Sequence, residues 1–190
     1  MMTTTHPNLQ SVALPVSGTN KIAKFALLAI VGSIILAVSA HVKVPFYPVP
    51  ITMQTMVVLM IGMAYGWKLG GATILLYLAE GAVGLPVFTN GGGVHHLAGP
   101  TAGYLFGFFA AATTIGWLAE RGFDRSIAGT AMAMLVGTAI IYLFGVTWLS
   151  SLLGLEKGLQ FGLYPFIYGD ILKLVIAALA MPAAWSLLRK

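Results

Sequence analysis

The chain has 190 residues, of which 58% are hydrophobic and only 8% are charged, and its formal net charge is +5. Because soluble domains carry about 25% charged residues, this composition indicates an integral membrane protein and leaves no room for a separate soluble domain. The absence of cysteine excludes a disulfide framework and a thiolate metal site. Nucleic-acid binding is not expected, because the basic residues form no patch interleaved with aromatic side chains.

Residues 1–20 are polar and contain Pro and Gly, and are expected to form a cytoplasmic tail. Six apolar segments follow, and each is close to the roughly 20 residues that a helix needs to cross a bilayer. The segments do not alternate as barrel strands do, so helices are expected. They cover residues 22–40, 51–67, 69–87, 101–119, 127–150 and 166–188. The sequence therefore predicts an all-α integral membrane protein with a single six-helix transmembrane domain at 21–190.

The first segment also has features of a signal peptide, because Lys21 and Lys24 precede it and residues 38–40 resemble a cleavage site. The apolar core of a signal peptide has only about 7–15 residues, and this segment is longer, so a retained helix is expected. The second and third segments are separated only by residues 66–70, which predicts a tight turn between two helices.

Basic residues near the ends of the segments are distributed unevenly. Six crossings place both termini on one side, and most of these residues fall on that side: Lys21, Lys24, Lys68, Arg121, Arg125, Arg189 and Lys190. Lys43 and Lys157 fall on the other side, and Lys173 lies inside the last segment. Since cytoplasmic loops carry the excess of Lys and Arg, both termini are expected in the cytoplasm.

Small residues recur at helical spacing in three places. Two of them are glycine series, in which close packing of helices inside the protein is expected: Gly62, Gly66 and Gly70, and Gly99, Gly103 and Gly107. The third is a stripe on the first segment, formed by Ala29, Ser33 and Ala37. For this stripe, internal packing and the docking of a partner subunit both remain open.

The outer segment 41–55 departs from a plain lipid-soluble helix. Its prolines, at positions 45, 48 and 50, exclude regular helix and favour an extended, stiff segment. The segment carries Phe46 and Tyr47 and places Thr52, Gln54 and Thr55 at the mouth of the second helix. An interfacial aromatic belt would explain the two aromatic residues, but it leaves the prolines and Gln54 without a role.

A second outer segment, residues 84–104, contains three consecutive glycines at 91–93 beside Asn90. Glycines permit close approach of the backbone to a ligand, and an amide offers both donors and an acceptor. A flexible linker is the simpler interpretation, but Phe88 and Asn90 favour a shaped lid. His95 and His96 are adjacent, so their side chains are expected to diverge, and no metal site is expected.

Asp170 and Lys173 lie in the last helix, where an ionisable side chain costs about 2.5–3.5 kcal/mol. Residues three apart share one face of a helix, so the two charges can form a structural ion pair. Alternatively, Asp170 accepts from N–H groups of a ligand and Lys173 receives its anionic group. Aromatic residues cluster at the outer end of this helix, and all three polar segments face the outer side, which favours a small-molecule pocket.

No phosphate-binding loop is present, so active transport would need energy from another subunit or from an ion gradient. Proton-coupled secondary transport through Asp170 is one alternative. An intramembrane enzyme that uses His95 or His96 with Asp170 is another, but no nucleophile is placed with a base, so no enzymatic activity is expected.

Four motifs, in their order and spacing, resemble the BioY family, the biotin-specific substrate-binding (S) components of energy-coupling factor (ECF) transporters. They are VPITMQT at 49–55, GLPVF at 84–88, GPTAGYLFGF at 99–108 and PFIYGDILK at 165–173. The resemblance covers nearly the whole chain from Lys24 onward. It implies a six-helix S-component fold, with a biotin pocket near the outer surface that is closed by the loops after the first and third helices.

The resemblance also implies a function and partners. The chain would bind biotin with high affinity in a prokaryotic cell membrane, in contact with lipid and without a cofactor. Its energy would come from ABC-type ATPase subunits through a transmembrane coupling (T) subunit. A vitamin S component of another specificity is the alternative, because a fold alone does not set the ligand.

Ligand contacts implied by the resemblance map onto Asn90, Asp170 and Lys173, and further onto Gln54 and Tyr104. In this interpretation Asn90 and Asp170 hydrogen-bond the ureido ring of biotin, and Lys173 pairs with its carboxylate. From their chemistry alone, three aromatic residues are expected to pack its apolar part: Phe46, Phe88 and Tyr164. The family's coupling protein is expected on the stripe of Ala29, Ser33 and Ala37. Residues 94–96 depart from the family pattern, which has small or aliphatic residues there.

Overall fold

The computed structural model describes residues 7–9, 11 and 20–188, and these are mostly helical. The long helices are α2 (Asn20–His41), α3 (Gln54–Ala82), α4 (Ala102–Ala119), α5 (Ile127–Leu153) and α7 (Ile167–Leu188), with the short α6 (Leu155–Gly162) before α7. Three 3-10 turns, η1 (Val94–Leu97), η2 (Phe123–Arg125) and η3 (Tyr164–Phe166), and two short strands, β1 (Lys43–Val44) and β2 (Ile51–Thr52), complete it. Five helical stretches of the described chain are long and apolar enough to cross a membrane. The prediction of a helical, multi-pass membrane protein is confirmed, although a short β hairpin accompanies the helices.

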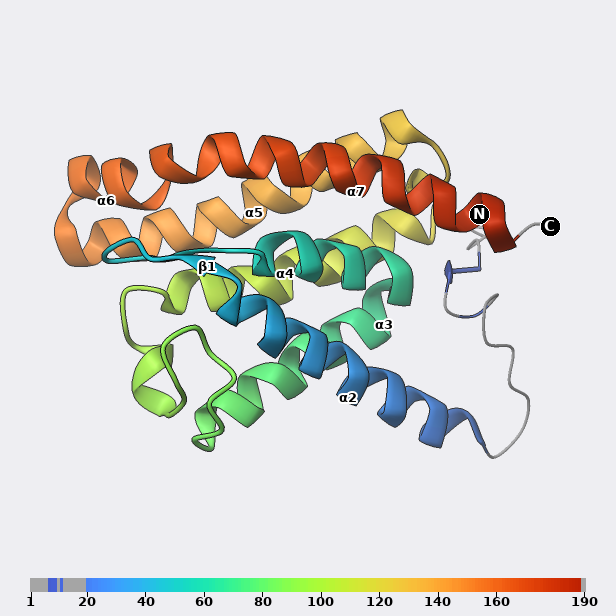
Figure 1. Ribbon diagram of the computed structural model, residues 1–190, viewed down its shortest axis with the longest axis horizontal. Helices are drawn as coiled ribbons and strands as arrows, with labels where there is room; N and C mark the ends of the chain where they lie inside the picture. Colours follow the sequence, from blue (N-terminus) through green and yellow to red (C-terminus); the bar gives the residue numbers. More distant parts are fainter. Residues whose placement is uncertain (1–6, 10, 12–19, 189–190) are drawn as a thin grey trace, which may run out of the picture.

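Helix α3 turns back on itself at Gly66. Its 29 residues would reach about 44 Å if straight, which exceeds the roughly 30 Å of a hydrocarbon core. Gly66 interrupts the helix with φ 78° and ψ 174°, a conformation open essentially to glycine alone. Figure 1 shows that the chain reverses direction here: the first arm, 54–65, runs toward the turn, and the second arm, 67–82, runs back from it. The tight turn predicted between the second and third segments therefore lies at Gly66.

Members of both glycine series pack helices against each other, as predicted, whereas Gly66 forms the turn of α3 and Gly99 lies in the loop before α4. A Cβ atom on Gly62 would lie 2.6 Å from the carbonyl oxygen of Ala112 in α4. On the opposite side of α4, a Cβ atom on Gly103 would lie 2.5 Å from the carbonyl oxygen of Phe144 in α5. No methyl group fits at either distance, so these glycines let α4 pack closely between α3 and α5.

Helix α2 packs against α3 through part of its small-residue stripe. Ser33 is fully buried, and its hydroxyl donates to the Glu80 carboxylate in the second arm of α3. Ala29 and Ala37 are half-buried. At Ser33 the stripe therefore serves internal packing, because the hydroxyl supplies the hydrogen bond that a carboxylate at membrane depth requires. The docking of a partner on this face stays a prediction.

The two ends of the molecule differ in their basic residues. One end holds the start of α2, the Gly66 turn, η2 and the end of α7, with Lys21, Lys68 and Arg125. Here Asn8 Nδ2 donates to the Tyr65 carbonyl at 3.0 Å, so residues 7–9 lie at this same end. The β hairpin, the loop 83–101 and α6 form the other end. Most of the predicted tail, and Arg189 and Lys190, lie outside the described residues.

Gly66→Ala is expected to destabilise the protein, because the side chain would be forced into a conformation that costs about 1–3 kcal/mol. The new Cβ would also lie 2.5 Å from both Asn8 Nδ2 and Glu120 Oε1. Thermal unfolding in detergent should show a lower midpoint than for wild type. Gly169→Ala is the matched control, since no atom lies within 4 Å of its added Cβ. Equal midpoints for the two variants would contradict this role of Gly66.

Candidate functional site

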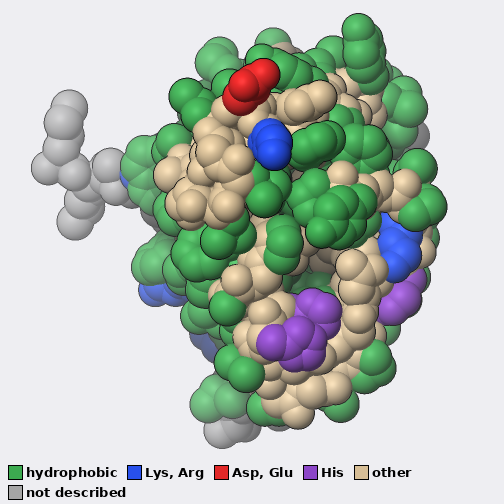
Figure 2. Space-filling view, turned by 90° about the vertical axis from the view of Figure 1, so that its left-hand side faces the viewer, with side chains coloured by type: hydrophobic (Ala, Val, Ile, Leu, Met, Phe, Trp, Pro, Cys, Tyr) green, Lys and Arg blue, Asp and Glu red, His purple; other side chains and the backbone are tan. Residues whose placement is uncertain are grey.

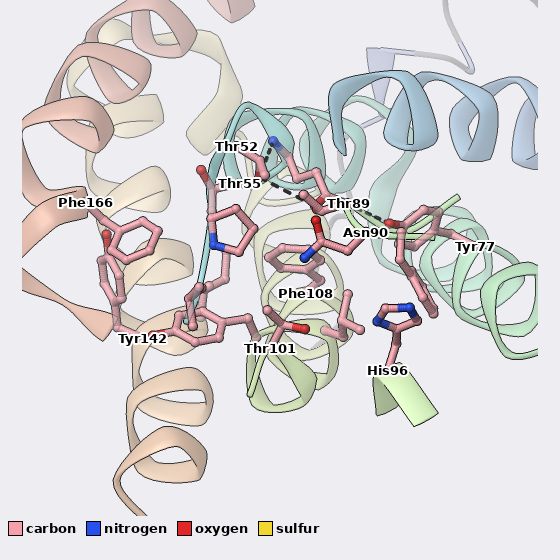
Figure 3. Close-up of a pocket in the computed structure, with 17 residues that line it drawn as sticks. Thr52, Thr55, Tyr77, Thr89, Asn90, His96, Thr101, Phe108, Tyr142 and Phe166 are labelled. Atoms are coloured by element: carbon pink, nitrogen blue, oxygen red, sulfur yellow. Dashed lines mark hydrogen bonds between the residues drawn. The ribbon is translucent and has the colours of Figure 1, made fainter. Parts of the chain in front are cut away.

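A cavity of about 660 Å³ of empty space, its open mouth included, lies between the β hairpin, the loop 83–101 and helices α3, α4 and α5. Its apolar wall is mainly aromatic: Tyr77, Phe88, Tyr104, Phe108, Tyr142 and Phe166. Polar side chains break this wall in a few places: Thr52, Gln54, Thr55, Thr89, Asn90, His96 and Thr101. Figure 3 shows them converging from separate elements. An apolar, largely aromatic wall with a few convergent polar groups is typical of a small-molecule site.

The hairpin that closes one side of this cavity is the extended segment predicted from its prolines. Strands β1 and β2 are antiparallel, with Lys43 opposite Thr52 and Val44 opposite Ile51. Proline cannot donate to a strand ladder, so the three prolines fall in the connection between these strands rather than within them. Val49, Pro50 and Thr52 of this hairpin reach the cavity wall.

The loop 83–101 has a defined shape, as the lid interpretation predicts. Phe88 and Gly91 exchange backbone hydrogen bonds of 2.9 and 3.1 Å, and Gly93 N donates to the Gly81 carbonyl at 2.7 Å. The Phe88 ring is buried over Gly81, where an added Cβ would lie 2.1 Å from it. The loop is thereby attached to the second arm of α3, and it presents Asn90 and His96 to the cavity.

Gln54 joins the two arms of α3 to this loop. Its Nε2 donates to the Tyr77 hydroxyl at 2.7 Å, and that hydroxyl donates to the Val87 carbonyl at 3.1 Å. Its Oε1 accepts from the Thr89 hydroxyl at 3.2 Å. Because Gln54 is almost fully buried, these bonds satisfy an amide that would otherwise be costly at this depth. Gln54 therefore lines the cavity and also holds the lid in place.

Asp170 and Lys173 form a buried ion pair, with Lys173 Nζ 2.8 Å from Asp170 Oδ1. The ammonium also donates to the Thr52 carbonyl at 2.7 Å and to Thr55 Oγ1 at 3.0 Å. These three acceptors match the three N–H donors of a lysine. The second carboxylate oxygen of Asp170 accepts from the Tyr142 hydroxyl. The pair therefore links α7 to the hairpin, to α3 and to α5.

Of the eight residues predicted to bind the ligand, the structure brings four together on the cavity wall: Asn90, Gln54, Tyr104 and Phe88. Asp170 and Lys173 lie behind that wall, beside a smaller cavity of about 230 Å³ that shares only Thr55 with the main one. Phe46 lies in an outer groove next to the mouth. Tyr164 is 56% exposed and lies outside the lining of the main cavity.

The sequence alone does not identify several residues that line the cavity or its outer groove. Tyr142 lies inside an apolar segment without a polar neighbour that would single it out, and Phe108 ends the motif at 99–108 without being marked there as a ligand contact. In the sequence, Lys43 is interpreted only as a topology signal, although in the structure it contacts Asn90. For Tyr77 the sequence contains a weak signal of a polar site, because Tyr77 lies one turn before Glu80 in an otherwise apolar segment.

The histidine pair differs from the prediction. The rings of His95 and His96 do not diverge, because their centroids are 4.2 Å apart in the 3-10 turn η1. His96 lines the cavity and meets the Phe88 ring edge-on at 5.8 Å. Burial, and then the neighbouring His95, lower the pKa of His96 below its ordinary value, so its imidazole is neutral at neutral pH. Within the described residues, no group of three or more His, Asp or Glu side chains is arranged to hold a metal ion.

Known proteins are similar in sequence to this chain over most of its length. One relative, the biotin transporter BioY of Thermotoga maritima, is 40% identical over 147 residues, which are 76% of this chain and 86% of the relative. Another, the biotin transporter BioY of Rhizobium etli, is 37% identical over 164 residues, or 80% of this chain and 88% of the relative.

The fold also has a solved counterpart. The crystal structure of the S-component for biotin from an ECF-type ABC transporter matches with a TM-score of 0.73 and covers 90% of this chain and 95% of its own. At 24% identity, this similarity concerns the fold. The family model that describes BioY matches residues 7–190. The chain therefore belongs to the BioY family.

Proposed function

We propose that this chain binds biotin in the cavity described above and serves as the substrate-binding subunit for biotin uptake. The observation that carries the proposal is a largely enclosed aromatic cavity, with Asn90 and Gln54 on its wall, in a member of the BioY family. The two relatives described above are named biotin transporters, and the family assignment extends that role to this chain.

The chemistry of the cavity suits biotin part by part. The ureido ring needs both donors and acceptors, and the Asn90 amide supplies both. The Tyr142 hydroxyl gives its hydrogen to Asp170, so its oxygen is left to accept from a ureido N–H group. Asp170 would then act on the ligand through Tyr142, without direct contact. Phe88 and Phe108 offer apolar surface to the thiophane ring.

Lys173 has a supporting role in this proposal. Its three N–H donors are taken by Asp170, Thr55 and the Thr52 carbonyl. Direct pairing with the ligand carboxylate, which the resemblance implies, would require one of these bonds to break. In the geometry described, the ammonium holds Thr52 and Thr55, two residues of the cavity wall, in position.

Lys173→Met is expected to weaken biotin binding by about 2–5 kcal/mol, because it leaves Asp170 buried without its cation. Asp170→Asn should also weaken binding, since it leaves the buried Lys173 ammonium without its carboxylate partner. The double variant should lose less than the sum of the two, because no unpaired charge remains. Equilibrium binding of labelled biotin to the purified chain measures these effects. Lys157→Met, at an exposed position, is the control.

Strict additivity of the two losses would contradict a coupled pair. Unchanged affinity in a folded Lys173→Met protein would remove Lys173 from the site altogether.

We further propose that the chain crosses the membrane six times, with the two arms of α3 as separate crossings and both termini in the cytoplasm of a prokaryotic cell. The end that holds Lys21, Lys68 and Arg125 would face the cytoplasm. The mouth of the cavity would then face outward.

The absence of cysteine in the chain makes this topology testable with single cysteines. Lys157→Cys should react with a membrane-impermeant maleimide on intact cells. Lys68→Cys, at an exposed position beside the Gly66 turn, should react only after the cells are opened. Labelling of both positions from outside would contradict the proposed orientation.

Energy for uptake would come from a transmembrane coupling subunit and ABC-type ATPase subunits, because the chain has no phosphate-binding loop of its own. Biotin accumulation should therefore stop when the ATPase is inactivated. It should persist through brief exposure to an uncoupler while ATP is maintained. The reverse result would favour a proton-coupled mechanism through Asp170.

A further inference from the structure

Lys43 spans the mouth of the cavity. It lies on β1, and its Nζ is 2.5 Å from the Thr89 carbonyl oxygen and 3.0 Å from Asn90 Oδ1 in the loop 83–101. The hairpin and the lid loop are thus joined across the opening by one ammonium group. Two acceptors occupy two of its three N–H donors, which leaves one for a further partner.

A groove of about 530 Å³, its open side included, lies beside the cavity at this point. Pro50 and Asn90 line both the cavity and the groove, so the two spaces adjoin at these residues. The outer groove is completed by Lys43, Pro45, Phe46 and Tyr47. A ligand that fills the cavity could therefore extend a flexible chain past Asn90 into a groove that has apolar sides and a cation. Figure 2 shows this end of the molecule, where charged side chains are sparse among hydrophobic ones.

The other candidate cations near the cavity either have all their N–H donors in hydrogen bonds within the protein or are uncharged. Lys173 is buried, and its donors are satisfied within the protein. His96 lines the wall, but burial lowers its pKa, so it carries no charge at neutral pH. Among the described residues that line the cavity or its outer groove, this leaves Lys43 as the cation with hydrogen-bonding capacity to spare.

We propose that the Lys43 ammonium recognises the carboxylate of the ligand at the outer end of the cavity. This inference rests on the proposed function, because it names the partner of the carboxylate when biotin occupies the site. The contacts with Thr89 and Asn90 hold the ammonium in place before the ligand arrives, which lowers the entropic cost of the interaction. The same contacts would make closure of the lid loop sensitive to an anionic ligand.

The test compares the binding of biotin with that of biotinamide, in which a neutral amide replaces the carboxylate. Wild type should prefer biotin by about tenfold, the lower range for a hydrogen bond to a charged group at an exposed site. Lys43→Gln should lose much more affinity for biotin than for biotinamide, and with it the preference for biotin. Lys43→Arg should keep much of it, and Lys157→Gln is the matched control at another exposed lysine.

Retention of the full preference by Lys43→Gln would overturn the inference. An equal loss for both ligands would overturn it too, since it would show that Lys43 only bridges the two loops. A wild type that binds both ligands without preference would have the same consequence and leave the proposed function intact. A wild type that binds neither ligand would remove both proposals. If Lys43→Gln does not fold, added salt provides the second measurement: it should reduce the preference of wild type, and an unchanged preference would contradict the inference.

Discussion

The buried Lys173 ammonium is the constraint on which the outer half of this protein depends. A lysine in the last helix is tolerated because α7, the β hairpin and α3 each supply one acceptor for it. The hydrogen bonds that satisfy this one charge hold the hairpin and the N-terminal end of α3 against α7. Since the removal of one partner of such a pair is costly, the three elements must remain together. Thr52 is central, because its carbonyl accepts from Lys173 while it lies opposite Lys43 in the strand register.

A second set of buried polar groups fixes the opposite side of the cavity. Gln54 ties the Tyr77 hydroxyl to Thr89 of the lid loop, and the Phe88 ring is set over Gly81. With both sides held by satisfied hydrogen bonds, the cavity is formed before a ligand enters. A preformed site spends less binding free energy on ordering its own loops. The two sides meet where Lys43 contacts Asn90, beside the outer groove that adjoins the cavity.

The sequence predicts the fold class well because membrane insertion leaves a strong, local signal. Hydrophobic length identifies the helices, basic residues separate the two ends, and the glycine series at 62–70 and 99–107 indicate the close contacts of α4. It also identifies Asp170, Lys173, Asn90 and Gln54 as unusual polar residues. What it cannot supply is the direction in which a side chain points. Lys173 turns toward Asp170, Thr55 and the Thr52 carbonyl behind the wall. Ser33 turns inward to Glu80, and Tyr142 enters the site from an apolar helix. Each of these directions depends on three-dimensional packing.

If the enclosed cavity of this chain holds biotin, equilibrium binding of radiolabelled biotin to the purified protein in detergent should show it most directly. We expect saturable binding of one biotin per chain, displaced by unlabelled biotin, with a dissociation constant in the nanomolar range, or about −12 kcal/mol. The absence of saturable binding to a folded, monodisperse protein would contradict biotin as the ligand. The cavity would then belong to a different ligand.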